Sequence, residues 1–395
     1  MRKNFYEETR QTLDNHLKNG TYKKLNILQS PLNSTATVEN FGERIIMCSN
    51  NYVGMSNNPY VVEKAKEALD NYGCGASSVR FICGTFEIHR VLEQNIADFL
   101  GFESSITYTS CFSANNAVIP ALVNDGDVII SDELNHASII DGCRLAGKGV
   151  LKKVYKHSDM ESLEERLIET KDCGVALVVT DGVFSMEGDI CKLPEIIALC
   201  KKYNAILMVD DSHSTGVIGK TGRGTMEYYN ITEGVDLVSG TLGKALGGAG
   251  GGFIASTKDV TELLIQKSRP HLFSNSLPPV LCAIGSASID FLRDNPNIVS
   301  SLKEKTEYMR KKLKDAGLKP LDGDSAIIPI IVGETAVAIK AAEMMMEQGL
   351  YTTGFGFPVV PEGEARVRLQ ISDTLSYEEL DKAFNIIVDV INKLM

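Results

Sequence analysis

The stretch Asp236-Leu-Val-Ser-Gly-Thr-Leu-Gly-Lys-Ala-Leu-Gly-Gly-Ala-Gly-Gly-Gly252 joins a short apolar run to a glycine-rich segment. The apolar run ends at Ser239 and predicts a buried strand, while the glycines predict irregular backbone that approaches another part of the chain closely. Lys244 stands at the junction, without a carboxylate beside it in the sequence. Desolvation there would lower the pKa of its amine and make it a nucleophile, as a Schiff-base lysine requires. An ordinary surface lysine beside a glycine-rich loop is the alternative.

Similar apolar runs recur along the chain and predict further strands. Helical patterns, such as Met160–Lys171 and Leu193–Tyr203, lie between them. This alternation predicts an α/β fold with a mainly parallel sheet, in which ligands bind beyond the carboxyl ends of the strands. The predicted strands are Ser105–Thr109, Val128–Ser131, Val175–Thr180, Ala205–Val209, Asp236–Ser239 and Gly252–Ala255.

Three regions are expected from the order of these patterns. Residues 1–50 form an N-terminal segment with a helix and a strand, which we expect to associate with the small domain. Residues 51–289 form the large domain, and residues 290–395 form a smaller C-terminal α+β domain. The helix expected over residues 2–19 carries Phe5, Leu13 and Leu17 on one face and should lie on a neighbouring element.

The chain has 395 residues and a formal net charge of −11. That charge argues against nonspecific binding to nucleic acid or to an anionic membrane. No uncharged apolar run approaches the ~20 residues of a membrane span, and the N-terminus has no apolar signal-peptide region. The nine cysteines form no C-x-x-C pair, and the six histidines show no H-x-x-x-H or H-E-x-x-H spacing. We therefore expect a cytoplasmic enzyme with reduced thiols, no metal site, and no nucleic-acid or membrane partner.

Polar residues follow five of the predicted strands directly. Ser110–Asn115 opens a helical pattern, where backbone N–H groups and the helix dipole favour a phosphate, although an ordinary helix cap accounts for it equally well. A single histidine is more often structural than catalytic, but the joint occurrence of these residues at one sheet edge favours a ligand site. The other segments are Asp132–His136, Asp181–Gly188, Asp210–His213 and Gly240–Lys244.

These residues match the pattern of a known family. Asp210-x-x-His213 and Thr241-x-x-Lys244, with the acid and the lysine 34 positions apart, resemble the pyridoxal-phosphate-dependent enzymes of fold type I. Within that fold the chain is similar to the α-oxoamine synthases, which join an amino acid to an acyl-CoA, and the likeness runs from about Phe5 to the C-terminus. One departure is Glu187, where many relatives carry Asp. Further motifs are Cys48-Ser-Asn50-Asn-Tyr, Ser78-Val-Arg80-Phe-Ile-Cys-Gly84-Thr, Asn135-His136-Ala-Ser, Asp181-Gly-Val-Phe-Ser185-Met-Glu-Gly and Arg269-Pro-His-Leu-Phe-Ser274-Asn275.

The resemblance implies pyridoxal 5'-phosphate (PLP) as the cofactor of the large domain and gives the residues their catalytic roles. Lys244 would hold the cofactor covalently and, once released, remove the Cα proton of the substrate. Asp210 would pair with the pyridine nitrogen and keep it protonated. His136 would stack on the ring, while Ser185 and His213 would reach its phenolic oxygen.

The same resemblance implies how phosphate is bound. Thr241 and the backbone amides of Cys111 and Phe112 would hold it within one subunit. Ser274 and Asn275 would reach the phosphate of the other subunit's site, so that the active unit is a homodimer with shared active sites.

For the substrate, the implied binding residues are Asn50, His136 and Arg368. A guanidinium offers a planar two-point match to a carboxylate, and only Arg368 aligns with the family's carboxylate-binding residue. Arg366 lies two positions away and should face the same side of a strand. We interpret Arg366 as a solvated arginine of the strand surface.

The amino-acid sequences of Ser78–Thr85 and Asp210–His213 are most similar to those of the branch of the family that condenses glycine with acetyl-CoA. The products would be 2-amino-3-oxobutanoate and CoA, and the reverse reaction would serve threonine degradation to glycine. The nearest alternative is the branch that uses alanine and a pimeloyl thioester, because the site residues are shared and specificity depends on pocket volume. A noncatalytic protein that keeps the fold as a scaffold is the remote alternative.

Overall fold

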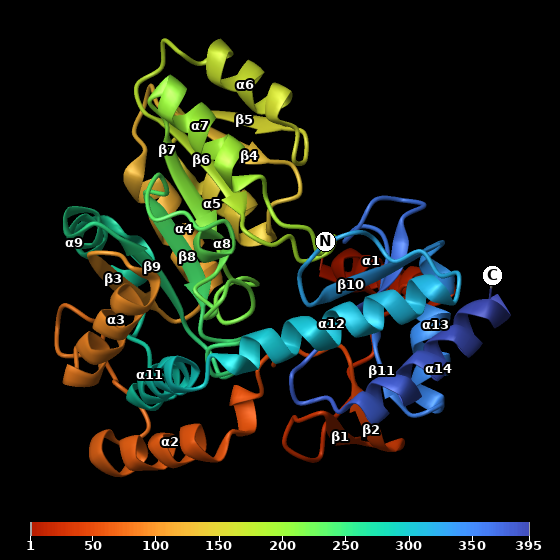
Figure 1. Cartoon of the computed structure of the whole chain (residues 1–395). Helices are drawn as coiled ribbons and strands as arrows, with labels where there is room; N and C mark the ends of the chain where they lie inside the picture. Colours follow the sequence, from red (N-terminus) through yellow and green to blue (C-terminus); the bar gives the residue numbers. More distant parts are fainter. Residues whose placement is uncertain (1, 395) are drawn as a thin grey trace. The chain divides into compact units, whose positions relative to one another are not determined.

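The computed structural model describes residues 2–394, and the chain divides into two compact units (Figure 1). The large unit comprises Asn50–Ser185 and Asp189–Lys303. The small unit comprises Met1–Ser49, Met186–Gly188 and Glu304–Met395. The three regions expected from the sequence remain a prediction.

The large unit contains a seven-stranded sheet in the order β3-β9-β8-β7-β6-β4-β5. Only β9 runs antiparallel to its neighbours, so the expected α/β fold with a mainly parallel sheet is confirmed. All six expected strands form, and β5 is an additional strand. The strands are β3 (Ser104–Tyr108), β4 (Val128–Asp132), β5 (Leu151–Tyr155), β6 (Ala176–Asp181), β7 (Ile206–Asp210), β8 (Leu237–Thr241) and β9 (Gly252–Ser256).

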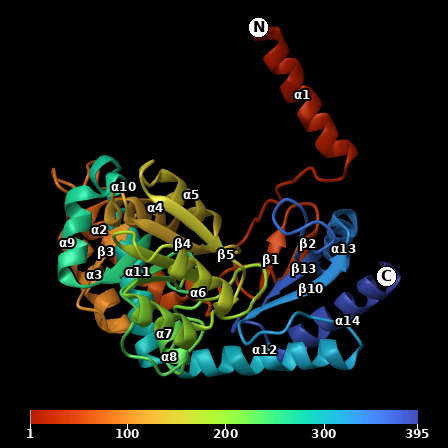
Figure 2. The ribbon, with the colours of Figure 1, turned by 90° about the horizontal axis from the view of Figure 1, so that it is seen from above.

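Helices cover both faces of this sheet, as a parallel sheet requires. Figure 2 shows α4 and α5 on one face and α6 and α7 on the other. Ile119 of α4 and Ile139 of α5 are fully buried against strand residues such as Ile129 and Met208. The helices are α2 (Pro59–Tyr72), α3 (Glu87–Leu100), α4 (Cys111–Leu122), α5 (Ala137–Leu145), α6 (Met160–Glu169), α7 (Leu193–Tyr203), α8 (Thr225–Tyr228), α9 (Lys258–Lys267), α10 (Arg269–Phe273) and α11 (Pro279–Asp294), with the short 3-10 helix η1 (Met55–Asn57).

The small unit holds two three-stranded sheets. In the first, β2 (Gly42–Ile46) lies between β1 (Thr35–Val38) and β11 (Leu350–Tyr351), and it pairs with β11 in parallel. This pairing joins the N-terminal segment to the C-terminal part of the chain. The second sheet has the order β10-β13-β12, with β10 (Ile327–Gly333), β13 (Ala365–Gln370) and β12 (Thr353–Phe355). The helices of this unit are α1 (Arg2–Lys18), α13 (Thr335–Glu347) and α14 (Tyr377–Leu394), and α12 (Asn297–Asp315) begins in the large unit and ends in the small one.

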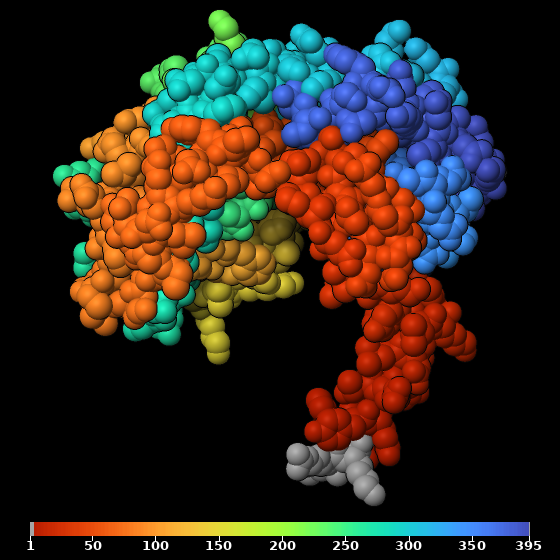
Figure 3. All heavy atoms as spheres, turned by 90° about the horizontal axis from the view of Figure 1, so that it is seen from below, coloured from red at the N-terminus to blue at the C-terminus, as the bar shows by residue number. Residues whose placement is uncertain are grey.

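The N-terminal helix α1 forms as expected, but the expectation that it lies on a neighbouring element is wrong. Phe5, Leu13 and Leu17 are 63%, 45% and 57% exposed. In Figures 2 and 3 the helix extends away from the other elements of the small unit. The helix has few apolar residues among many charged ones. The spacing of these apolar residues predicts a helix, but it does not determine whether another element covers them.

Within residues 2–394, no helix is long and apolar enough to cross a membrane. Each of the nine cysteines is a free thiol in the described chain.

The glycine-rich segment allows β9 to pass directly beside the start of α4. A Cβ atom on Gly252 would lie 2.2 Å from the backbone nitrogen of Cys111, far inside van der Waals contact. Gly251 forms an isolated parallel bridge with Ser110, the residue that caps α4. The close approach expected from the glycine run is therefore confirmed.

His157 connects two loops at the carboxyl edge of the sheet. Its Nδ1 lies 3.1 Å from Asp132 Oδ1, and its Nε2 lies 3.0 Å from Asp189 Oδ2. Burial lowers the pKa of His157, but the hydrogen bonds to the two carboxylates outweigh burial and raise that pKa to about 10. The charged imidazole thus holds the end of β4 against the loop that follows β6.

We expect Gly252→Ala to lower the free energy of unfolding by about 1–3 kcal/mol, because β9 and the start of α4 must move apart. Urea denaturation of the purified variant measures this loss. Gly75→Ala is the matched control, since its added Cβ would meet nothing within 4 Å. Equal stability of the two variants would contradict the close approach.

The His157 ion pairs predict a pH-dependent stability. Because the pKa of His157 is raised on folding, the contribution of the ion pairs is complete below the unfolded pKa of ~6.5 and is lost as pH rises toward about 10. The stability difference between wild type and His157→Gln should shrink by roughly 3–5 kcal/mol between pH 6 and pH 10. The exposed His16 on α1 provides the control, His16→Gln, and a flat difference for His157→Gln would refute the ion pairs.

Candidate active site

A cavity of about 180 Å³ lies in the large unit. It is at the carboxyl edge of the sheet, where the sequence predicts ligand binding. Seven of the expected site residues meet on its wall, and they come from the ends of β4, β7 and β8 and the start of α4. The lining residues are Ser110, Cys111, Phe112, His136, Ser138, Asp181, Val183, Asp210, Ser212, His213, Thr241 and Lys244.

The register of the central strands places three polar residues in one row. Asp181 of β6 pairs with Asp210 of β7, and Asp210 pairs with Ser239 of β8. Paired residues of adjacent strands point to the same face, so the two carboxylates lie near each other. All three residues are almost fully buried.

Asp210 carries the carboxylate with the most contacts in the cavity. Its Oδ2 accepts a hydrogen bond of 2.6 Å from Asn115 Nδ2, and its Oδ1 accepts one of 2.9 Å from the backbone amide of Ser212. The Cys111 thiol lies 3.7 Å from Oδ2. These contacts fix the orientation of a carboxylate that is 4% exposed.

His136 caps the N-terminus of α5 and faces the cavity. Its backbone amide donates to Asp181 Oδ2 at 3.1 Å, and the ring of Phe112 meets its imidazole edge to face at 6.4 Å. Burial lowers the pKa of His136, the charge of Asp210 opposes that effect, and the charge of Lys244 reinforces it. The net effect favours a neutral imidazole.

His213 is oriented by a residue distant in sequence. Its Nδ1 lies 2.8 Å from the hydroxyl of Tyr52, and the two rings meet edge to face. Both side chains are buried. Tyr52 therefore fixes the imidazole that the resemblance assigns to the phenolic oxygen of the cofactor.

The amine and the start of α4 complete the cavity. Lys244 follows β8 and is half-buried on the cavity wall. Thr241 Oγ1 accepts a hydrogen bond of 3.0 Å from the amide of Gly243, which shapes this turn. Cys111 and Phe112 form the first turn of α4, where backbone N–H groups point away from the helix and attract anions.

The residues present fit PLP. An amine suits its aldehyde, a buried carboxylate suits its basic ring nitrogen, an imidazole suits its ring face, and a helix N-terminus suits its phosphate. Asp181 Oδ1 is also buried without a hydrogen-bond partner among the described residues. Burial, and then the nearby charge of Asp210, raise the pKa of Asp181 well above its ordinary value.

Five expected site residues do not line this cavity. Ser185 is half-buried after β6, and Asn50 is half-buried between β2 and η1. Ser274 and Asn275 follow α10 and are exposed in the single chain. Arg368 belongs to β13 of the small unit, where its Nη2 donates to Gln370 Oε1 at 3.0 Å and its guanidinium lies 4.6 Å from the ring centroid of Phe355.

The interpretation of Arg366 as a solvated arginine is wrong. Its side chain is 1% exposed, and its Nη1 donates at 3.0 Å to both Glu187 Oε1 and the carbonyl of Met186. Burial of a guanidinium is tolerated only when the charge is paired, and Glu187 supplies that charge. Arg368 Nη1 also reaches Met186, through its sulfur at 3.8 Å, so the two arginines share one side of β13 as expected.

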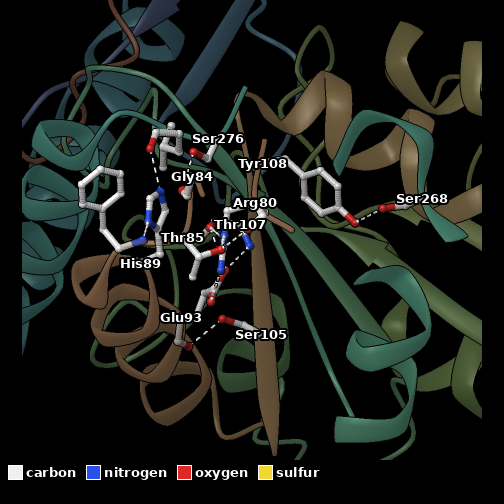
Figure 4. Close-up of polar contacts among 12 residues, drawn as sticks. Arg80, Gly84, Thr85, His89, Glu93, Ser105, Thr107, Tyr108, Ser268 and Ser276 are labelled. Atoms are coloured by element: carbon white, nitrogen blue, oxygen red, sulfur yellow. Dashed lines mark hydrogen bonds and ion pairs between the residues drawn. The ribbon is translucent and has the colours of Figure 1, made fainter. Parts of the chain in front are cut away.

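The motif Ser78–Thr85 forms a loop held by a partly buried ion pair between Arg80 and Glu93 (Figure 4). Arg80 donates to both carboxylate oxygens of Glu93, at 2.7 and 3.1 Å, and Thr107 also donates to Glu93. The carbonyls of Ser78 and Gly84 accept hydrogen bonds from Ser276. The loop thus anchors the segment that directly follows the exposed Ser274 and Asn275.

Sequence reasoning missed Asn115, Ser138 and Tyr52 as site residues. Each of them belongs to a sequence motif in which another residue is a predicted site residue. Asn115 is four residues after Cys111 on α4, and residues four apart share a helix face. That spacing could have placed Asn115 beside Asp210. The contact of Tyr52 with His213 spans 161 positions and has no local pattern.

Comparisons with known proteins show the family and the fold of this chain. The family model described as aminotransferase class I and II matches residues 43–387. The chain is 43% identical to 2-amino-3-ketobutyrate coenzyme A ligase of Salmonella typhimurium over 97% of this chain and 96% of the relative. It is 42% identical to the 8-amino-7-oxononanoate synthase of Thermoanaerobacter pseudethanolicus, over 95% of this chain and 94% of the relative.

The fold is similar to that of a serine palmitoyltransferase from S. paucimobilis solved with a bound PLP-myriocin aldimine. The TM-score is 0.93 at 28% identity, over 99% of this chain and 98% of that chain. The matched family model covers most of the chain, and the first relative is similar over nearly its whole length. The chain therefore belongs to the aminotransferase class I and II family.

Proposed function

We propose that this chain is a PLP-dependent acyltransferase that condenses glycine with acetyl-CoA to give 2-amino-3-oxobutanoate and CoA. In the reverse direction it cleaves 2-amino-3-oxobutanoate with CoA, as in threonine degradation to glycine. The observation that carries the proposal is that Lys244, Asp210 and His136 line the same cavity. The similarity to 2-amino-3-ketobutyrate coenzyme A ligase supports this choice of substrates.

The bound cofactor supplies an electron sink for the negative charge that develops on the substrate Cα. Asp210 holds the ring nitrogen protonated, because its carboxylate is buried and oriented by Asn115 and Ser212. Lys244 Nζ holds the cofactor between turnovers and takes the proton from Cα during turnover. His136 would cover the cofactor ring, and the neutral imidazole favoured by burial would add no charge beside Lys244.

The phosphate is held at the start of α4 by the amides of Cys111 and Phe112 together with Thr241. Ser185 and His213 bind the phenolic oxygen, with His213 held in place by Tyr52. Ser274 and Asn275 complete the phosphate site of a second subunit. Their exposure in the single chain and the anchoring of Ser276 by the Arg80 loop support a homodimer with shared sites.

Arg368 and Asn50 bind the carboxylate of glycine, together with His136. The guanidinium of Arg368 is positioned by Gln370 and by the ring of Phe355. Arg366 on the same strand forms an ion pair with Glu187. Of the two arginines of β13, Arg368 is therefore the one proposed to bind the substrate.

The free thiols support a location in the cytoplasm.

An 8-amino-7-oxononanoate synthase activity is the competing proposal, because a relative of that name is almost equally similar. Release of CoA should be measured for glycine and alanine, each with acetyl-CoA and pimeloyl-CoA. We expect kcat/KM for glycine with acetyl-CoA to exceed that for alanine with pimeloyl-CoA by about 100-fold or more, because a pocket shaped for the smaller pair would exclude the larger one. The reverse order would establish the competing activity.

Arg368→Lys is the variant that separates binding from chemistry in the same assay. It keeps the charge but loses the planar two-point match, so KM for glycine should rise about tenfold or more. Arg44→Lys, a change to another arginine of the small unit, should leave KM unchanged. If purified wild-type protein showed neither cofactor absorbance nor activity on either substrate pair, the protein would instead be a noncatalytic scaffold with this fold.

A further inference from the structure

A hydrogen-bonded chain of side chains connects Asp210 to His136 across the wall of the cavity. Asn115 Nδ2 donates to Asp210 Oδ2 at 2.6 Å and to Ser138 Oγ at 2.9 Å. Ser138 Oγ lies 2.7 Å from Nδ1 of His136. These four side chains come from α4, α5, the end of β7 and the cap of α5, so the chain is made by the fold and by no single motif.

The donors and acceptors in this chain can be arranged in one way. Asn115 carries two amide hydrogens on Nδ2, and both are used, one by Asp210 and one by Ser138. The backbone amide of Ser138 donates to His136 Nδ1 at 3.2 Å, so this ring nitrogen is an acceptor. Because Ser138 Oγ already accepts from Asn115, its own hydrogen is available for the same nitrogen.

The result is a defined state of the imidazole. His136 is held neutral, with its hydrogen on Nε2, the nitrogen outside this chain. The opposite orientation of the Asn115 amide would place Oδ1 against the carboxylate of Asp210, where two acceptors repel. Asn115 is fully buried and Ser138 is 1% exposed, so water does not compete for these bonds.

We propose that Asn115 is a positioning residue that couples the carboxylate facing the ring nitrogen to the imidazole that covers the ring. Without Asn115, the amide of Ser212 would remain as a donor to Asp210, but the connection to Ser138 and His136 would be lost. Asn115 thus sets the orientation of Asp210 and the hydrogen position on His136 together. The inference deepens the proposed function and rests on it for the roles of Asp210 and His136.

The first test uses the protein without cofactor, so it does not depend on activity. Nitrogen-15 NMR of histidine-labelled protein identifies the ring hydrogen and the pKa of His136, with assignment by a His136→Gln sample. In wild type, Nδ1 should be the unprotonated nitrogen. In Asn115→Asp the donor to Ser138 is replaced by an acceptor, so the pKa of His136 should rise measurably.

Several groups face His136 in this titration. Asp181 accepts from its backbone amide, and the charges of Asp210 and Lys244 act on its ring. Asn115→Asp adds a negative charge nearby, so the neutral Asn115→Ala variant must show the same direction of change. Asn116→Ala is the matched control, since Asn116 is the next residue of α4 and its Oδ1 has no partner among the described residues.

The second test uses the enzyme with PLP. In Asn115→Ala we expect kcat to fall about tenfold or more, the effect of losing one hydrogen bond to a charged group. KM for glycine should change less than about threefold, because the substrate carboxylate is bound elsewhere. Circular dichroism and urea denaturation confirm that each variant is folded.

An unchanged ring state and pKa of His136 in folded Asn115→Ala and Asn115→Asp would overturn the proposal. A variant whose kcat and KM match those of Asn116→Ala would also overturn it. Failure of the proposed function has a different outcome. The wild-type protein would then lack PLP binding or activity, while the NMR comparison without cofactor would still report whether Asn115 controls His136.

Discussion

The buried carboxylate of Asp210 is the constraint on which the site depends. A charge that is 4% exposed must be paired or hydrogen-bonded, because an uncompensated buried charge costs several kcal/mol. Asn115 and the amide of Ser212 meet part of that need in the described structure. A protonated ring nitrogen would supply the opposite charge. The ends of β6, β7 and β8 and the start of α4 are arranged around this one group.

Close packing of backbone makes that arrangement possible. The absence of a side chain at Gly252 lets β9 pass Cys111, which fixes where α4 begins and so where its N–H groups and Asn115 lie. The register of β6 and β7 then pairs Asp181 with Asp210. In the small unit, the buried pair of Arg366 and Glu187 plays a comparable part, because it fixes the strand that carries Arg368.

The sequence predicted those parts that follow from local patterns. Buried strands have continuous apolar runs, so six strands and the polar residues at their ends could be placed, including Lys244 and Asp210. The edge strand β5 was missed because it is largely exposed and carries Lys152 and Lys153. Contacts between distant segments, such as Tyr52 with His213 and Arg366 with Glu187, leave no periodic pattern. A helix pattern likewise did not determine what covers α1.

The proposed role of Lys244 is to carry PLP covalently, opposite Asp210. Borohydride reduction of the purified protein, followed by peptide mass mapping, tests it most directly, because reduction makes the link permanent. We expect one reduced cofactor per chain, on the peptide that contains Lys244. Lys244→Ala should carry none, and Lys258→Ala, a change to an exposed lysine of α9, should be labelled as wild type. A label on another lysine, or none in wild type, would show that Lys244 does not carry the cofactor.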